Sequence, residues 1–130
     1  MIAARVRRDR DGQAAVELAL ALPVVVLFVL GAVQVALVAR DRVAIELAAR
    51  EGARAASVSA DPVGAATAAA RRATRLEPID VAVELIGDTV RVTVRFVDPT
   101  DVALIGDVIA PVALQASAVM ALEPPAPGAP

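Results

Sequence analysis

The stretch that decides the fold is GQAAVELALALPVVVLFVLGAV at residues 12–33. Residues 18–33 contain no charged or amide side chain, and the apolar run continues to residue 39 with Gln34 as its one polar member. A helix over residues 13–39 measures about 40 Å at ~1.5 Å per residue, which exceeds the ~30 Å hydrocarbon core of a membrane. The stretch therefore predicts a transmembrane helix, tilted to fit.

A short basic leader, residues 1–12, precedes this helix and carries four arginines: Arg5, Arg7, Arg8 and Arg10. The alternative is a cleaved secretory signal, which would leave a soluble protein that starts near Leu37 or Arg40. The apolar region of such a signal is about 7–15 residues long and thus shorter than this one. The length of the run favours a retained membrane anchor.

The helical pattern continues beyond the apolar run to about Ser57 and includes AAREGARAA at residues 48–56. Glu46 precedes Arg50 by four residues, which is the favoured order for an ion pair along a helix. Gly52 costs a helix interior about 1 kcal/mol relative to Ala, so it indicates either close packing or a local break. We expect the small side chains of this stretch to pack against the rest of the chain.

A second helix and three strands are predicted after Ser57. Asp61 followed by Pro62 is typical of a helix start, and this helix should end by about residue 76, before Glu77-Pro78. Apolar and polar residues then alternate with a period of two over residues 81–85, 90–96 and 112–122. Gly87-Asp88, which separates the first two runs, is a two-residue hairpin signal.

The expected fold class is α+β, with a long N-terminal transmembrane helix, a short helix and an antiparallel three-stranded sheet. The domain organisation is a leader at 1–12, a transmembrane helix at 13–39, a small domain at 40–122 and a Pro-rich tail at 123–130. The apolar face of the sheet can be buried against the second half of the long helix.

The composition argues against several classes of function. The chain has no Cys and no His, so thiol chemistry, the usual general base and the commonest metal ligand are missing. No acidic cluster has the spacing of a calcium loop. The net charge of −2 argues against nucleic acid as a partner. We therefore expect no enzymatic activity, no cofactor and no metal site.

Two residues in the apolar run are unusual. Glu17 stands directly before sixteen apolar residues, where a charge costs several kcal/mol unless it is paired or reaches the headgroups. One interpretation is that Glu17 only marks the membrane boundary. Pro23 removes a backbone donor and predicts a kink inside the membrane. Such a kink either helps the helix to pack among others or is simply tolerated.

The basic leader, Gly12, Glu17 five residues later and the apolar helix together resemble the processing signal of type IV prepilins. More narrowly, residues 12–23, Gly31 and residues 48–56 resemble the TadE family, pilin-like proteins of tight-adherence (Flp-type) pilus loci. The recognisable motifs cover about residues 8–56. Family members often carry Phe or Tyr where this chain has Leu18, and an acidic residue near the end of the span, where it has Gln34.

The resemblance implies a minor pilin or assembly factor of a tight-adherence pilus, in the plasma membrane, with a cytoplasmic N-terminus and an extracytoplasmic pilin-like domain at 40–122. A prepilin peptidase would cut between Gly12 and Gln13, and the freed α-amine could pair with Glu17. The implied partners are membrane lipid, other pilin-like subunits and the pilus assembly machinery. The alternative is a cell-envelope anchor unrelated to pili, which binds a ligand through its Pro-rich tail and the apolar loop at residues 102–109.

Overall fold

The computed structural model describes residues 2–98 and 111–123, and the side chains of the first helix from residue 12 onward. Helix α1 runs without interruption through Ile2–Ser57 and is followed by helix α2, Pro62–Ala73. Strands β1 (Ile79–Ile86), β2 (Thr89–Asp98) and β3 (Val112–Ala121) complete the fold. The apolar loop at 102–109 and residues 124–130 of the tail lie outside the described residues.

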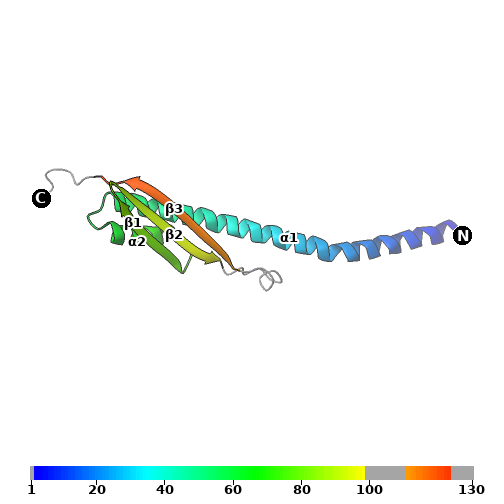
Figure 1. Cartoon of the computed structure of the whole chain (residues 1–130). Coiled ribbons are helices and arrows are strands. Elements are labelled where there is room, and N and C mark those ends of the chain that lie inside the picture. The colour runs from blue at the N-terminus through cyan, green and yellow to red at the C-terminus, as the bar shows by residue number, and fades with distance from the viewer. Residues whose placement is uncertain (1, 99–110, 124–130) are drawn as a thin grey trace.

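The three strands form one antiparallel sheet in the order β1-β2-β3. Both helices pack on the same face of this sheet, with α1 under β2 and β3 and α2 beside β1. Figure 1 shows the two layers and shows that α1 extends far beyond the sheet. The molecule thus consists of a long helical rod, α1, and a small head, formed by α2 and the sheet, which packs on the second half of this rod. This arrangement confirms the predicted α+β class.

The core lies between the sheet and the second half of α1. This half contributes residues spaced three and four apart, which fall on one side of a helix. Apart from Ile45, the buried apolar side chains of α1 and α2 are alanines, whereas the sheet supplies the larger side chains. The buried apolar residues are Ile45, Ala48, Ala49, Ala53, Ala56, Ala66, Ala70, Val90, Val92, Val94, Phe96, Leu114 and Ala116. Small helix side chains let the helices approach the sheet closely, so the head is held together by many short contacts.

The predicted turns are present. Asp61 caps α2 by accepting a hydrogen bond from the Gly64 backbone N–H at 3.0 Å, and Pro62 occupies the first turn. Gly87 begins the two-residue turn between β1 and β2 with φ +56, a left-handed conformation that glycine adopts without steric cost. The sequence pattern therefore located both the start of α2 and the hairpin correctly.

Two local predictions were wrong. Helix α2 ends at Ala73 instead of about residue 76, because Thr74 is already extended and its Oγ1 accepts a hydrogen bond from the Leu76 N–H at 3.1 Å. Glu46 forms its ion pair with Arg42, at 3.1 Å, and not with Arg50. Both arginines are four residues from Glu46, so spacing alone did not decide between them.

Candidate functional site: the N-terminal half of α1

Three of the residues singled out in the sequence lie close together in the N-terminal part of α1. Gly12, Gln13 and Glu17 are all exposed and fall within about a turn and a half of α1. The Gln13 side-chain amide donates a hydrogen bond to the Glu17 carboxylate at 3.2 Å. A Cβ atom built on Gly12 would have no neighbour within 4 Å, so the Gly12-Gln13 bond lies in open surroundings.

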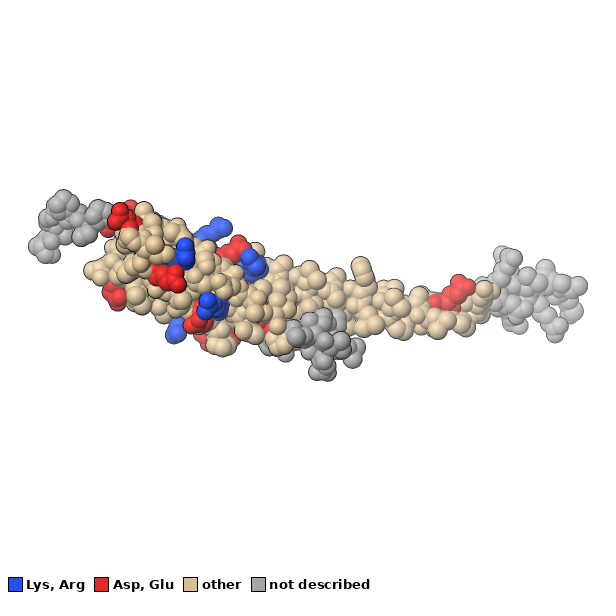
Figure 2. All heavy atoms as spheres, viewed as in Figure 1, with Lys and Arg blue, Asp and Glu red and all other residues tan. Residues whose placement is uncertain are grey.

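Glu17 is the one charged residue between Gly12 and Ala39. Figure 2 shows this part of α1 as an almost uncharged surface, whereas acidic and basic side chains gather on the head. In lipid, a carboxylate in this position needs a partner or contact with the headgroups. The Gln13 amide supplies one hydrogen bond but no positive charge, so a cation could still be accommodated beside Glu17.

Pro23 lies six residues beyond Glu17 and is not part of this group. Its side chain is exposed, and α1 continues through it as one helix. Because Pro lacks an N–H, one carbonyl in the preceding turn loses its usual helical partner. The kink expected at Pro23 remains a prediction.

The burial of Gln34 was not predicted from the sequence. It is the first buried residue met along α1 from Gly12, with 6 % of its surface exposed. Neither its side-chain nitrogen nor its oxygen has a hydrogen-bond partner within the described part of the chain. The available signal was its position as the one polar residue in the apolar run 18–39. Gln34 marks where α1 begins to be covered, between the bare rod and the head.

The second motif, residues 48–56, forms the packing face of α1. Ala49, Gly52, Ala53 and Ala56 are buried against the sheet and α2, whereas Arg50 and Arg54 between them are exposed. The expected packing of the small side chains within the molecule is confirmed. This motif therefore holds the head on the rod.

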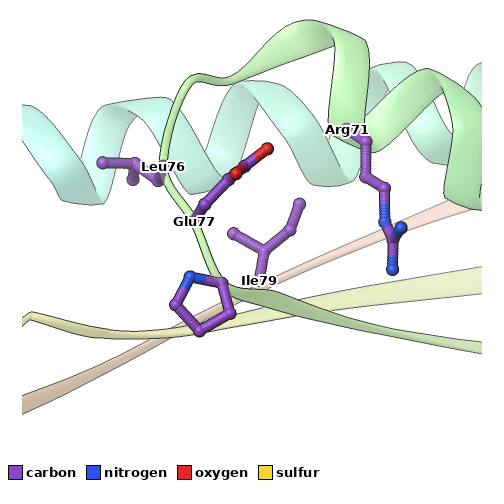
Figure 3. A pocket seen from close by; sticks show the side chains of 5 residues that line it. Arg71, Leu76, Glu77 and Ile79 are labelled. Carbon is purple, nitrogen blue, oxygen red and sulfur yellow. The ribbon is translucent and has the colours of Figure 1, made fainter.

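A cavity of about 450 Å³ lies between the end of α2 and the start of β1. It is lined by Arg71, Leu76, Glu77, Pro78 and Ile79. Figure 3 shows the Ile79 side chain between the charged groups of Arg71 and Glu77. The charged groups that line the cavity are the Arg71 guanidinium and the Glu77 carboxylate, and the lining residues include no nucleophile with an adjacent base.

No group of three or more acidic side chains that could hold a metal ion occurs among the described side chains, those of residues 12–98 and 111–123. The helix Gly12–Ser57 is long and apolar enough to cross a membrane, and its most apolar part is almost uncovered by the rest of the molecule. A helix that is apolar on all sides and bare of protein contacts is suited to lipid or to neighbouring helices. Single-pass anchoring by α1 is compatible with this arrangement.

Residues 12–54 match the family model described as TadE-like protein. No curated protein and no solved structure matches the chain. The match begins at the exposed Gly12 and ends two residues beyond the buried Gly52, so it covers the bare half of α1 and most of the half that packs on the sheet. The resemblance seen in the sequence is confirmed: residues 12–54, which form most of α1, are similar to the TadE-like family.

Proposed function

We propose that this protein is a minor pilin-like (pseudopilin) component or assembly factor of a tight-adherence type IV pilus. It is anchored in the plasma membrane through residues 13–39 and acts through protein contacts, without catalysis. Its rod packs with the helices of other pilin-like subunits, and its head contacts the pilus assembly machinery.

The observation that carries this proposal is where the TadE-like match falls on the structure. The matched residues 12–54 form one continuous helix whose first half is bare and whose second half is covered by the head. A bare apolar helix can move from lipid into a bundle of similar helices with little change in its apolar surroundings. This property suits a subunit that is stored in the membrane and passed to an assembly.

Processing and orientation complete the proposal. A prepilin peptidase removes residues 1–12 at the open Gly12-Gln13 bond, and the new α-amine of Gln13 pairs with Glu17. The leader, with four arginines close to the span, holds the N-terminus in the cytoplasm as a prepilin signal would, although Arg40 and Arg42 also follow the span. Residues 40–122 then lie outside the cytoplasm.

The test is the mass and N-terminal sequence of protein extracted from membranes of the native host. The proposal predicts a mature chain that starts at Gln13, together with loss of surface filaments when the gene is deleted and their return on complementation. An intact N-terminus with normal filaments in the deletion strain would favour the cell-envelope anchor unrelated to pili. A start near Leu37 or Arg40 would mean a secreted protein.

A further inference from the structure

Strand β3 is an edge of the sheet, and half of its peptide groups point away from β2. The Leu122 N–H donates to the Asp88 carbonyl at 2.7 Å, which places residue 122 among those bonded toward β2. Peptide groups alternate in direction along an antiparallel strand, so the odd-numbered residues of β3 point outward. Consistent with this, the next N–H, that of Glu123, donates to the Ser57 carbonyl of α1 at 2.9 Å.

The outward groups nearer the middle of β3 have no such partner. At Gln115 and Ser117, no hydrogen bond from the described residues reaches the outward backbone N–H or C=O. An exposed edge of this kind is a template for a further strand. The edge is thus closed by α1 at Glu123 and open at Gln115 and Ser117.

A groove of about 330 Å³ lies beside this open edge, where β3 crosses α1 (Figure 1). One wall is β3, and the other is a stripe along α1, because residues four apart on a helix are offset by only about 40° around its axis. The lining residues are Arg42, Glu46, Arg50, Gln115, Ala116 and Ser117. The unpaired backbone groups of Gln115 and Ser117 therefore lie beside a polar surface of α1.

The charge of the groove is positive. Arg42 is paired with Glu46 at 3.1 Å, which leaves Arg50 without an ion pair in the part of the chain that the structure describes. Arg42 and Arg50 are separated by about 12 Å along the helix axis. Two residues four apart in an extended strand are separated by about 13 Å and point to the same face.

We propose that this groove binds an extended acidic segment of a partner protein, which adds to β3 as a fourth strand. Its backbone pairs with Gln115 and Ser117, and two carboxylates four residues apart contact Arg42 and Arg50. Main-chain pairing supplies affinity in this mode, and the side-chain contacts supply specificity. The inference goes beyond the proposed pilus role, because it requires only the head and the half of α1 that the head covers, and neither processing nor membrane anchoring.

A second copy of the chain is the competing occupant. Its β1 is also an edge strand, and Asp80 and Glu84 of that strand are four residues apart. However, α2 packs beside β1 and carries the exposed Arg71 and Arg72. In addition, Asp80 and Glu84 are already paired within the chain, with Arg95 at 3.8 Å and Arg91 at 3.5 Å. The electrostatics favour a separate acidic segment.

The test is binding of a fluorescent peptide to the full-length protein in detergent micelles. The probe is an extended Thr/Val peptide with two Glu residues four apart, and the reference probe has Gln in their place. We expect the acidic probe to bind roughly tenfold more tightly than the reference, and Arg50→Glu to remove this preference. Arg54→Glu, four residues away and outside the groove, should keep it. Equal binding of both probes to the wild type, or no binding of either, would overturn the proposal.

A second pair of variants tests the main-chain pairing. Gln115→Pro removes the outward N–H without breaking a bond to β2, whereas Gln115→Ala retains that N–H and loses only the side chain. The proline variant should lose probe binding and the alanine variant should keep it, with unchanged circular dichroism in both. Sedimentation that shows self-association of the wild type, abolished by Gln115→Pro, would assign the edge to a second copy and contradict the acidic partner. If the Gln115→Pro variant unfolds, binding of the acidic probe to Arg50→Glu compared with Arg54→Glu still tests whether the groove is the binding site.

Discussion

Gly52 of α1 and Val92 of β2 lie so close together that a Cβ atom on Gly52 would be 3.0 Å from Val92 Cγ1. The same atom would lie 3.2 Å from the backbone carbonyl oxygen of Ala66 in α2. Gly52 is thus the point where both helices and the sheet meet. The approach of three elements explains why a residue that weakens a helix stands inside the C-terminal part of α1.

A larger side chain at this point should destabilise the head. Gly52→Leu gains helix propensity of up to about 1 kcal/mol but forces the buried Val92 and the α2 backbone apart, which typically costs about 1–3 kcal/mol or more. We expect a net loss, measured as a lower midpoint of thermal unfolding in detergent. Gly31→Leu is the matched control, because a Cβ there has no neighbour within 4 Å. Equal midpoints for both variants and the wild type would show that the contact is unimportant.

Local signals in the sequence were sufficient for most of the fold. The change of period from 3.6 to 2 located the sheet, and Gly87-Asp88 located the hairpin, because a two-residue turn fixes the register of its strands. Asp61-Pro62 located the start of α2 for a similarly local reason. The sheet strands, the hairpin and the start of α2 are determined by residues close to one another in the chain, so the sequence pattern alone predicts them.

The features that were missed depend on tertiary structure. An apolar run predicts burial but does not distinguish lipid from a protein core, so the point near Gln34 at which α1 begins to be covered could not be predicted. The groove between Arg50 and Gln115 exists only because β3 crosses α1. Of the candidate site, the grouping of Gly12 and Glu17 followed from the resemblance to a prepilin signal, whereas the hydrogen bond between Gln13 and Glu17 required side-chain positions.

Processing can be tested at Gly12. Gly12→Trp should leave the leader attached, because a bulky side chain does not fit where the family's peptidase accepts a small residue. Intact mass of membrane-extracted protein measures the outcome. Gly31→Trp, which also introduces Trp at an open position of the same helix, should still be processed. Mature protein of wild-type mass from the Gly12→Trp variant would rule out cleavage after this glycine.

The orientation is tested by a protease added to spheroplasts. Residues 58–130 should lie outside the cytoplasm. Arginines stand on both sides of the span, so the charge rule alone does not decide the orientation, and the prediction follows from the resemblance of the leader to a prepilin signal. A tag at Pro130 should therefore be digested, and a tag at Met1 in the unprocessed Gly12→Trp background should be protected. Protection of the Pro130 tag together with digestion of the Met1 tag would reverse the orientation.

The last prediction concerns Glu17. After cleavage, the α-amine of Gln13 would lie one helical turn from the Glu17 carboxylate, which the Gln13 side chain already reaches at 3.2 Å in the uncleaved chain. Glu17→Gln should leave membrane insertion intact, because an amide costs less in lipid than an ion. It should weaken association with pilin partners, because it removes one charge of a poorly hydrated pair, a loss that typically costs about 3–5 kcal/mol.

Crosslinking and co-purification of partners at matched expression measure this loss. Glu123→Gln is the control, since it removes a carboxylate from the head and leaves the rod unchanged. If Glu17 only marks the membrane boundary, its headgroup contact is equally available to an amide, and partner recovery stays the same. Reduced recovery for Glu17→Gln alone, with normal insertion, separates the two interpretations, because only an ion pair within the assembly depends on the charge of this side chain.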